Sequence, residues 1–193
     1  ENQSMFDVDG YRFVYVINTR RIGSTPDYNC SQYSLELEAV CNENKLGSNN
    51  IDAAFRYTKI GQNYDVGFLG AVESDENFSE GKDFFGVRYR VKKDNLSVGY
   101  LGTFVKNPIM DREANVNALD FDYRSANDLR IYGLLLNSIV EDQKGYGLRM
   151  SLRKQVNRDL STGFGFFYLD EDLNLDDMGY LFRNDWIMFG GRT

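Results

Sequence analysis

Residues 82–106, KDFFGVRYRVKKDNLSVGYLGTFVK, constrain the fold more than any other part of this chain. Apolar and aromatic residues alternate there with small, polar or cationic ones, and side chains at that spacing point to opposite faces of a β-strand. A short polar turn at residues 93–95 separates two such runs, which predicts a β-hairpin. Both strands are longer than the roughly 5–6 residues usual in soluble domains. They match the roughly 9–11 residues of a tilted strand that crosses a bilayer.

The same alternation recurs along the chain and predicts further strands. They are expected at residues 11–17, 51–60, 64–73, 115–124, 128–138, 145–154 and 159–169, with a tenth beginning near Asp185. Residues 128–138 are the least regular, because Tyr132, Leu134 and Leu136 blur the alternation.

The connections between these strands are predicted to alternate in length. Short turns are expected near Gly61, Asp94, Ala126 and Val156, and long connections at residues 18–50, 74–83, 106–114, 139–144 and 170–184. Bacterial outer-membrane barrels have short turns at one end and longer loops at the other. We therefore predict an all-β fold, an antiparallel up-and-down transmembrane β-barrel with about ten strands in this chain, or part of a larger barrel. A soluble barrel of lipocalin type, with the apolar face inward, is the alternative.

Composition agrees with a strand-rich membrane protein and excludes several classes. The chain has 13 Tyr and 14 Phe but only 2 Pro. With 29 acidic and 22 basic residues, its net charge of -7 argues against nucleic-acid binding. No apolar run approaches the roughly 20 residues of a transmembrane helix. We expect residues 1–193 to form one barrel domain of a processed or partial chain, because it begins at Glu1 and its last residues read as an interrupted strand.

Cys30 and Cys41 are the only two cysteines, and they lie in a polar stretch that reads as a loop. In an oxidising compartment a disulfide would close this loop, and two free thiols are the alternative. Without His, two cysteines do not suit a structural zinc site.

The strand face opposite the aromatic one carries most of the charged residues inside the predicted strands, with cations in excess. Taken as facing the lumen, these are Arg12, Asp52, Arg56, Asp65, Glu73, Arg88, Arg90, Lys92, Asp120, Asp122, Arg130, Arg149 and Arg153. Arginines in a lumen could select anions or bind sugar hydroxyls. The other interpretation, which we favour, is that opposite charges pair across neighbouring strands and close the lumen.

Other candidate sites are weaker. The acidic run at residues 170–177 has carboxylates at alternate positions, as calcium prefers, but lacks the glycine and distal glutamate of an EF-hand, so a solvated loop is favoured. Tyrosines near strand ends fit an aromatic girdle at the bilayer interface: Tyr64, Tyr100, Tyr123, Tyr146 and Tyr168. Without His there is no Ser-His-Asp triad, and no phosphate-binding motif is present, so we expect neither an enzyme nor a cofactor or metal.

Four stretches of this chain resemble a family of bacterial outer-membrane barrels without assigned activity. They are RRIG at 20–23, FFGVRYRVKKDNLSVGYLGT at 84–103, ALDFDYR at 118–124, and YLDEDLNLDDMGYLFRND at 168–185, within which GYLFRND is the most specific. Members resemble fusions of a family-nine-like carbohydrate-binding domain to a C-terminal barrel. The resemblance covers most of the chain, which has no segment similar to the carbohydrate-binding domain. It implies a barrel in the Gram-negative envelope and a link to saccharides.

Together these observations predict an integral protein of the bacterial outer membrane, porin-like, that acts in transport or surface binding. Expected partners are membrane lipid and lipopolysaccharide, a saccharide or anionic solute, and a protein at a barrel edge or a periplasmic domain. Nucleic acid is not expected. The alternatives are a scaffold barrel that anchors a partner domain or envelope complex, and a soluble ligand-binding barrel. A conductive lumen would favour transport, whereas a lumen closed by Arg–carboxylate pairs would favour the scaffold.

Overall fold

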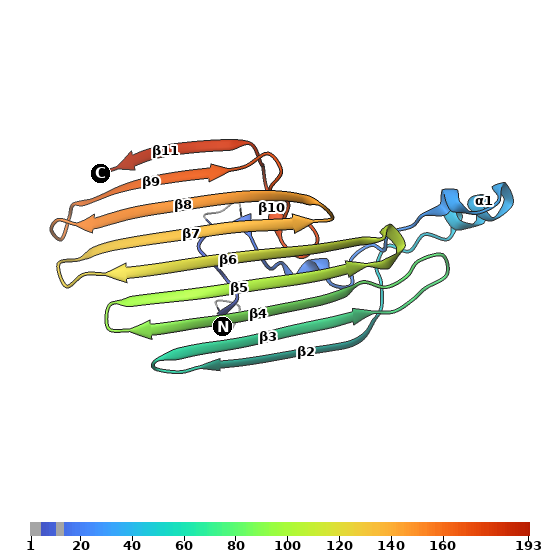
Figure 1. Cartoon of the computed structure of the whole chain (residues 1–193), viewed down its shortest axis with the longest axis horizontal. Coiled ribbons are helices and arrows are strands. Elements are labelled where there is room, and N and C mark those ends of the chain that lie inside the picture. The colour runs from blue at the N-terminus through green and yellow to red at the C-terminus, as the bar shows by residue number, and fades with distance from the viewer. Residues whose placement is uncertain (1–4, 11–13) are drawn as a thin grey trace.

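The computed structural model describes residues 5–10 and 14–193, and it is built around one long antiparallel sheet (Figure 1). The sheet has nine strands in the order β11-β9-β8-β7-β6-β5-β4-β3-β2. The strands are β2 (Ile51–Ile60), β3 (Tyr64–Glu73), β4 (Asp83–Lys93), β5 (Leu96–Asn107), β6 (Arg112–Arg124), β7 (Leu129–Val140), β8 (Gln143–Gln155), β9 (Ser161–Leu169) and β11 (Trp186–Arg192). Every pairing within the sheet is antiparallel and joins strands that follow one another around the meander.

The all-β antiparallel meander is confirmed, but the described chain does not form a closed barrel, because β2 and β11 are the two ends of the sheet. Of the predicted first strand, residues 11–17, residues 11–13 lie outside the described part of the chain, and residues 14–17 are not part of this sheet. Within it only β1 (Val14–Tyr15) is described as a strand, and it pairs with β10 (Tyr180–Leu181) in a separate two-stranded sheet. Val14 and Val16 are buried against the large sheet. Their period-2 pattern therefore reflects packing on a sheet face rather than pairing at its edge.

Two connections predicted to be long are short. Strands β7 and β8 are joined by residues 141–142 alone, and β5 and β6 by the 3-10 helix η5 (Pro108–Met110) and Asp111. Glu141 and Asp111 have φ of 54° and 47°, a left-handed conformation that lets the chain reverse within a few residues. The remaining connections at that end, residues 16–50, 74–82 and 170–185, are long, so the predicted asymmetry holds only in part.

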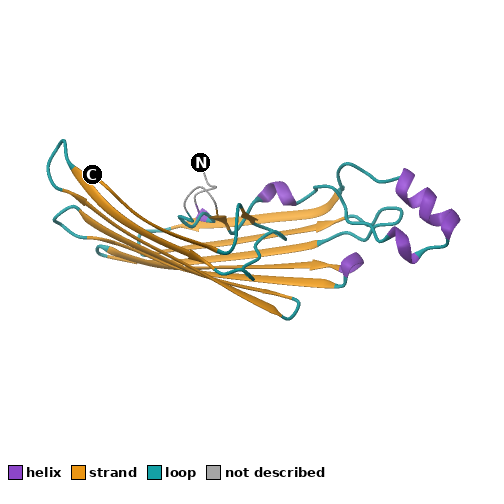
Figure 2. Cartoon of the chain, turned by 90° about the horizontal axis from the view of Figure 1, so that it is seen from above, coloured by secondary structure: helices purple, strands orange, loops and turns teal. Residues whose placement is uncertain are grey.

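The two faces of the sheet have different surroundings (Figure 2). The covered face carries Leu69, Ala71, Phe84, Leu101 and their register partners, which are buried. The open face carries the aromatic alternation of the sequence and is exposed over most of its extent. Its exposed members include Phe55, Tyr57, Phe68, Phe85, Tyr89, Val98, Tyr100, Leu119, Phe121, Leu135, Tyr146, Met150, Phe164, Ile187 and Phe189.

Two segments of the chain cover the covered face. The N-terminal segment, described at residues 5–10 and 14–18, buries Met5, Phe6, Val8, Val14 and Val16. The C-terminal loop, residues 170–185, buries three further apolar side chains, Leu173, Leu175 and Met178. The backbone N–H of Asn18 donates to the Met178 carbonyl at 2.7 Å and joins the two segments. One core therefore forms between the sheet and these segments.

Aromatic rings of the open face lie over glycines on the neighbouring strand. Gly70 is directly opposite Phe55, and a Cβ at Gly70 would come within 2.2 Å of that ring. Gly133 has the same relation to Phe121, at 2.1 Å. The absence of a side chain at these glycines is thus what admits the rings.

A lobe closed by a disulfide projects from the long-loop end of the sheet (Figure 1). The predicted Cys30–Cys41 disulfide is confirmed. It joins the 3-10 helix η4 (Cys30–Gln32) to α1 (Leu35–Glu43), a helix in a stretch that the sequence predicted as loop. Good helix formers in LELEAVCNE, with Glu36 and Glu38 in the first turn, account for it. In the part of the chain that the structure describes, no helix has the length and apolar character to cross a bilayer.

Candidate functional site

Most charged residues of the covered face form ion pairs between strands, as the favoured interpretation predicts, although one of the pairs spans an intervening strand. Arg88 of β4 donates from Nη2 to both carboxylate oxygens of Asp120, at 2.6 and 2.9 Å. The pair bridges β5, where Gly99 leaves the space for it, since a Cβ there would lie 2.6 Å from Arg88 Nη2. The Arg88 side chain is only 1% exposed. A cation this deeply buried is paired rather than lining a water-filled pore.

A second group of charges lies nearer the short-turn end. Asp65 of β3, with no exposed side-chain surface, accepts hydrogen bonds from Arg90 Nη2 at 2.6 Å and from Lys92 Nζ at 2.7 Å. Lys92 Nζ also donates to the Gly61 carbonyl at 2.6 Å. Arg90 and Lys92, which the sequence placed in the lumen, thus share the carboxylate of Asp65.

A third group lies on β6 and β7. Asp122 accepts from Arg130 Nε at 2.9 Å and from Arg130 Nη2 at 2.7 Å, and Arg124 adds a contact of 3.2 Å. Arg124 and Arg130, together with Arg153 of β8, line an open hollow of about 400 Å³ at this end of the sheet. Seven of the predicted lumen residues are therefore brought into these three groups: Asp65, Arg88, Arg90, Lys92, Asp120, Asp122 and Arg130.

Two further predicted residues, Arg149 and Glu73, bind a covering segment or a loop instead. Arg149 of β8 forms a close ion pair with Asp9 of the N-terminal segment. The backbone N–H of Asp9 donates to the Tyr132 hydroxyl at 2.9 Å, and Arg149 lies over the Tyr132 ring. Glu73 is buried and accepts from the Gly23 backbone N–H at 2.8 Å, which fixes the start of the disulfide lobe.

The remaining predicted residues lie at the margins. Asp52 accepts a short hydrogen bond from Ser74 where β2 is irregular. Arg56 lies over the Phe6 ring, 5.3 Å from its centroid. Arg153 is exposed, and Arg12 lies outside the described residues.

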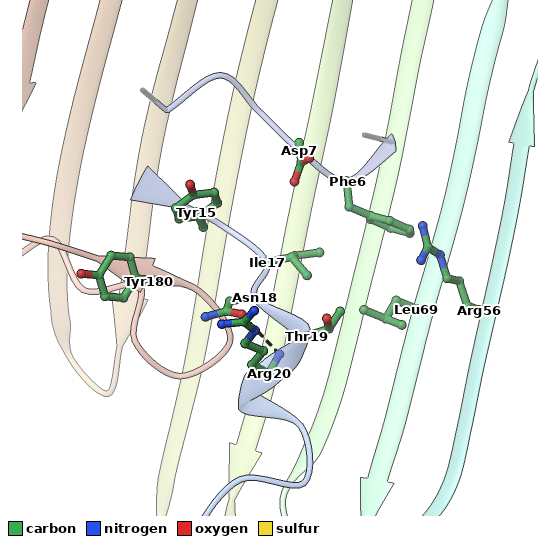
Figure 3. Close-up of a pocket in the computed structure, with 10 residues that line it drawn as sticks. All are labelled: Phe6, Asp7, Tyr15, Ile17, Asn18, Thr19, Arg20, Arg56, Leu69 and Tyr180. Carbon is green, nitrogen blue, oxygen red and sulfur yellow. Dashed lines mark hydrogen bonds between the residues drawn. The ribbon is translucent and has the colours of Figure 1, made fainter. Parts of the chain in front are cut away.

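A cavity of about 500 Å³ opens between the N-terminal segment, β10 and the start of the sheet (Figure 3). Phe6 and Leu69 in its lining are buried, whereas the charged side chains of the lining are exposed. Its lining consists of Phe6, Asp7, Tyr15, Ile17, Asn18, Thr19, Arg20, Arg56, Leu69 and Tyr180. The Tyr15 and Tyr180 rings lie 6.3 Å apart on paired residues of β1 and β10.

The chemistry of this cavity suits a small amphipathic ligand. Arg20 and Arg56 offer planar donors, which bind carboxylates or hydroxyl groups. Asp7 is the one acidic side chain in the lining, and burial raises the pKa of its carboxyl above the ordinary value. Of this lining only Arg56 was predicted as a site residue. Tyr15, Ile17 and Leu69 lie in predicted strands but were given no role at a site, and the other lining residues lie outside the predicted strands.

The C-terminal loop is not the purely solvated segment that its acidity suggested. Arg112 donates from Nε and Nη2 to the two oxygens of Asp177, at 3.0 and 2.8 Å. Asp176 lies 3.3 Å from Arg21 Nη2. The leucines between the acids are buried, and their spacing, Leu173-x-Leu175, was the signal that sequence reasoning missed. Over residues 5–10 and 14–193 no cluster of acidic or other ligating side chains is arranged to hold a metal ion.

The open face carries charge only near the strand ends. Asp83 and Lys93 lie at the two ends of β4, and the open-face residues between them are Phe85, Val87, Tyr89 and Val91. On β8 the corresponding limits are Lys144 and Lys154. Of the predicted girdle, Tyr64, Tyr123 and Tyr146 lie toward strand ends, whereas Tyr100 pairs with Tyr89 near the middle of the sheet. Tyr100 donates from its hydroxyl to Asn117 Oδ1 at 2.6 Å.

Comparison of this chain with protein-family models, with curated proteins and with solved structures found no match. The resemblance to outer-membrane barrels that the sequence suggested therefore stays a prediction.

Proposed function

We propose that this chain is part of the wall of a β-barrel in the bacterial outer membrane, with the open face against lipid. In this proposal it acts as an anchor that holds the disulfide-closed lobe at the membrane surface. The observation that carries the proposal is the belt of uncharged, largely aromatic side chains on the open face, limited at both ends by charged residues.

The height of this belt suits a bilayer. At about 3.3 Å per residue, Asp83 and Lys93 are separated by about 33 Å along β4. A strand inclined by about 45° then spans about 23 Å of membrane, close to the apolar band of about 25 Å in outer-membrane barrels. The belt runs across all nine strands and exceeds the apolar patches of a few hundred Å² found on soluble monomers. A soluble barrel would bury these aromatic side chains instead.

The side chains of the covered face favour a role as an anchor rather than as an open channel. Met5, Phe6 and Val8 pack on the sheet, and the charges beneath and beside them are paired. A water-filled pore needs polar side chains free to meet water. Arg–carboxylate pairs that close the lumen favour a scaffold, and such pairs lie on this face, so a scaffold is better supported than transport through an open lumen.

Lipid contact can be tested with the single tryptophan of the chain. Trp186 lies beside Leu169 and Phe167 on the covered face. In a Trp186→Phe background, a tryptophan introduced by Tyr89→Trp on the open face is expected to be quenched strongly by brominated phospholipids. The native Trp186 protein is the matched control and should be quenched several-fold less. Equal weak quenching at both positions, with release of the protein by alkaline carbonate, would disprove a lipid-facing wall.

A second candidate function is the binding of a small solute in the cavity beside β10, as transport or surface binding would require. The cavity of about 500 Å³ is large enough for such a ligand, and its two tyrosines and two arginines are typical of sites for saccharides or organic anions. The saccharide element rests on the family resemblance alone. Titration with neutral and acidic oligosaccharides should show binding that Arg56→Ala and Tyr180→Ala weaken, whereas Arg153→Ala, outside the cavity, leaves it unchanged.

A further inference from the structure

The apolar open face continues to both edges of the sheet, and the β11 edge in particular lacks the residues that protect an unpaired edge. Open-face side chains remain apolar to each edge, with Phe55 and Tyr57 on β2 and Ile187 and Phe189 on β11. Ile187 and Phe189 are 67% and 72% exposed. Soluble proteins protect long edges with proline, lysine or inward charges. The sequence of β11, WIMFGGR, has neither proline nor lysine, whereas β2 has Lys59 near one end and Arg56 on its covered side.

The directions of the strands restrict what can pair with these edges. Each step across the sheet reverses direction, so the first and ninth strands, β2 and β11, run the same way. Figure 1 shows both arrows pointing left. Direct closure of β2 on β11 would therefore create a parallel pair in a sheet whose other pairs are all antiparallel. Outer-membrane barrels of single chains are antiparallel with an even strand number.

A second copy of this chain meets the same restriction. Two copies inserted in one membrane with their disulfide lobes on the same side would bring β11 of one beside β2 of the other, which is again a parallel pair. A two-fold axis across the strands would make β11–β11 contacts antiparallel, but it would place the two lobes on opposite sides of the membrane.

We propose that the gap between β11 and β2 is filled by an odd number of antiparallel β-strands whose sequence differs from this sheet. The strand beside β11 must run antiparallel to it and place apolar side chains next to Ile187 and Phe189, so that the belt continues. An odd number restores both the antiparallel pattern and an even total. The orientation of the two copies in this inference rests on the proposed membrane barrel. The need for partner strands at the two edges rests on β2 and β11 themselves.

Cysteine cross-linking in the natural polypeptide, in the membrane of the cells that make it, tests the arrangement. Tyr57→Cys combined in turn with Ile187→Cys, Phe189→Cys or Gly191→Cys should give neither an intramolecular disulfide nor a disulfide-linked dimer after oxidation. Leu119→Cys with Leu135→Cys, directly opposite on β6 and β7, is the positive control and should cross-link within one chain. An intramolecular β2–β11 disulfide, or a dimer, overturns the proposal.

Hydrogen exchange supplies the positive measurement. In protein extracted from that membrane, backbone amides of β2 and β11 should exchange about as slowly as those of β6, because ladder hydrogen bonds protect them. Edge amides that exchange at least 100-fold faster than β6 would overturn the proposal. This result can be separated from the result of the lipid test. If the edge amides are protected but brominated lipid does not quench the tryptophan of the Tyr89→Trp variant, the membrane wall is refuted, whereas the proposal of additional strands between β11 and β2 still holds.

Discussion

Arg88 Nη2 lies 2.6 and 2.9 Å from the two carboxylate oxygens of Asp120, across the intervening strand β5, and both side chains are buried. Arg88 Nε and Nη1 have no hydrogen-bond partner among the described residues. The guanidinium thus makes its hydrogen bonds to the described residues through one nitrogen, and to one carboxylate. This makes the stability of the centre of the sheet unusually dependent on a single carboxylate.

Loss of that carboxylate is predicted to be severe. Asp120→Ala should lower the free energy of unfolding by about 3–5 kcal/mol, because it leaves a buried cation without a partner. The double variant Arg88→Met/Asp120→Leu removes both charges and should recover most of that loss. Reversible unfolding in detergent or lipid would measure both. If the double variant were as unstable as Asp120→Ala, the ion pair would not be the cause.

Contact between the C-terminal loop and β8 is predicted to depend on Gly145. A Cβ at Gly145 would lie 2.2 Å from Leu173 Cα and backbone N, neither of which can move without shifting the loop. Gly145→Ala should destabilise the protein by about 1–3 kcal/mol and speed hydrogen exchange in residues 170–178. Gly165→Ala is the matched control, since a Cβ there meets nothing within 4 Å on the same face. Similar effects of the two substitutions would contradict the packing described for the loop.

The ion pair between Arg149 and Asp9 is predicted to hold the N-terminal segment on the sheet. Arg149→Met keeps much of the apolar stem but removes the charge, and residues 5–10 should then exchange amide hydrogens several-fold faster. Arg153→Met, a surface arginine of the same strand, should leave that exchange unchanged. Hydrogen-exchange mass spectrometry resolves this segment, and no difference between the two variants would assign its anchoring to apolar contacts alone.

The disulfide lobe is predicted to loosen in acid. Asp27 lies 2.6 Å from Lys82 Nζ and accepts from Asn107 Nδ2 at 2.7 Å, so it ties the lobe to the sheet. Burial raises the pKa of Asp27, but the hydrogen bond and charge of Lys82, with Asn107, outweigh it and leave the pKa below its ordinary value. A lowered pKa means that Asp27 contributes stability at pH values above the ordinary value of about 3.9. That contribution is lost as the pH falls through the lower pKa of the folded protein.

Pepsin, which is active in acid, provides the measurement. Cleavage within residues 24–50 should accelerate as the pH falls below the ordinary Asp pKa of about 3.9 and through the lower pKa of Asp27 in the folded protein. Asp27→Asn should be cleaved quickly at every pH tested and should lose that dependence. A variant with the same pH profile as the native protein would show that another group controls the lobe.

Bilayer conductance distinguishes the anchor from the conduit. With Met5, Phe6 and Val8 packed on the covered face, we expect no steady single-channel conductance from the complete barrel in a planar bilayer. An anion-selective conductance, weakened by Arg153→Ala, would instead support the transport interpretation. It would require a water-filled path outside the packed region.

The sequence was sufficient to predict the strands of the large sheet, but not the segments that pack on its covered face. Alternation in β2–β6, β8 and β9 gave strand positions and faces, because one side of each strand repeats at period 2. It also placed Arg88, Asp120, Asp65 and Arg90 on one face, and the opposite charges on that face predicted pairing, although the Arg88–Asp120 pair reaches across a strand rather than to a neighbouring one. The partner of each charge was not readable, because register between strands depends on turns and bulges.

Segments without regular pairing were predicted poorly. Val14 and Val16 alternate like a strand of the sheet, yet they pack on its face, and local pattern does not distinguish these two environments. Helix α1 was missed because its nine residues have no clear apolar face, and the disulfide fixes Cys41 instead. The cavity beside β10 joins residues from the two ends of the chain, a proximity that only the folded covering segments create.

The two glycines that lie under Phe55 and Phe121 also restrict how the strands can slide. A slip of two residues keeps every side chain on its own face, so polarity alone does not oppose it. Such a slip would put Phe55 opposite Phe68 or Val72, and Phe121 opposite Ile131 or Leu135, where a bulky side chain occupies the space that each ring needs. Gly70 and Gly133 thus fix the register of their strand pairs, because they leave room for the rings of Phe55 and Phe121. The positions of these glycines therefore set how far along its strand each of the two aromatic side chains lies.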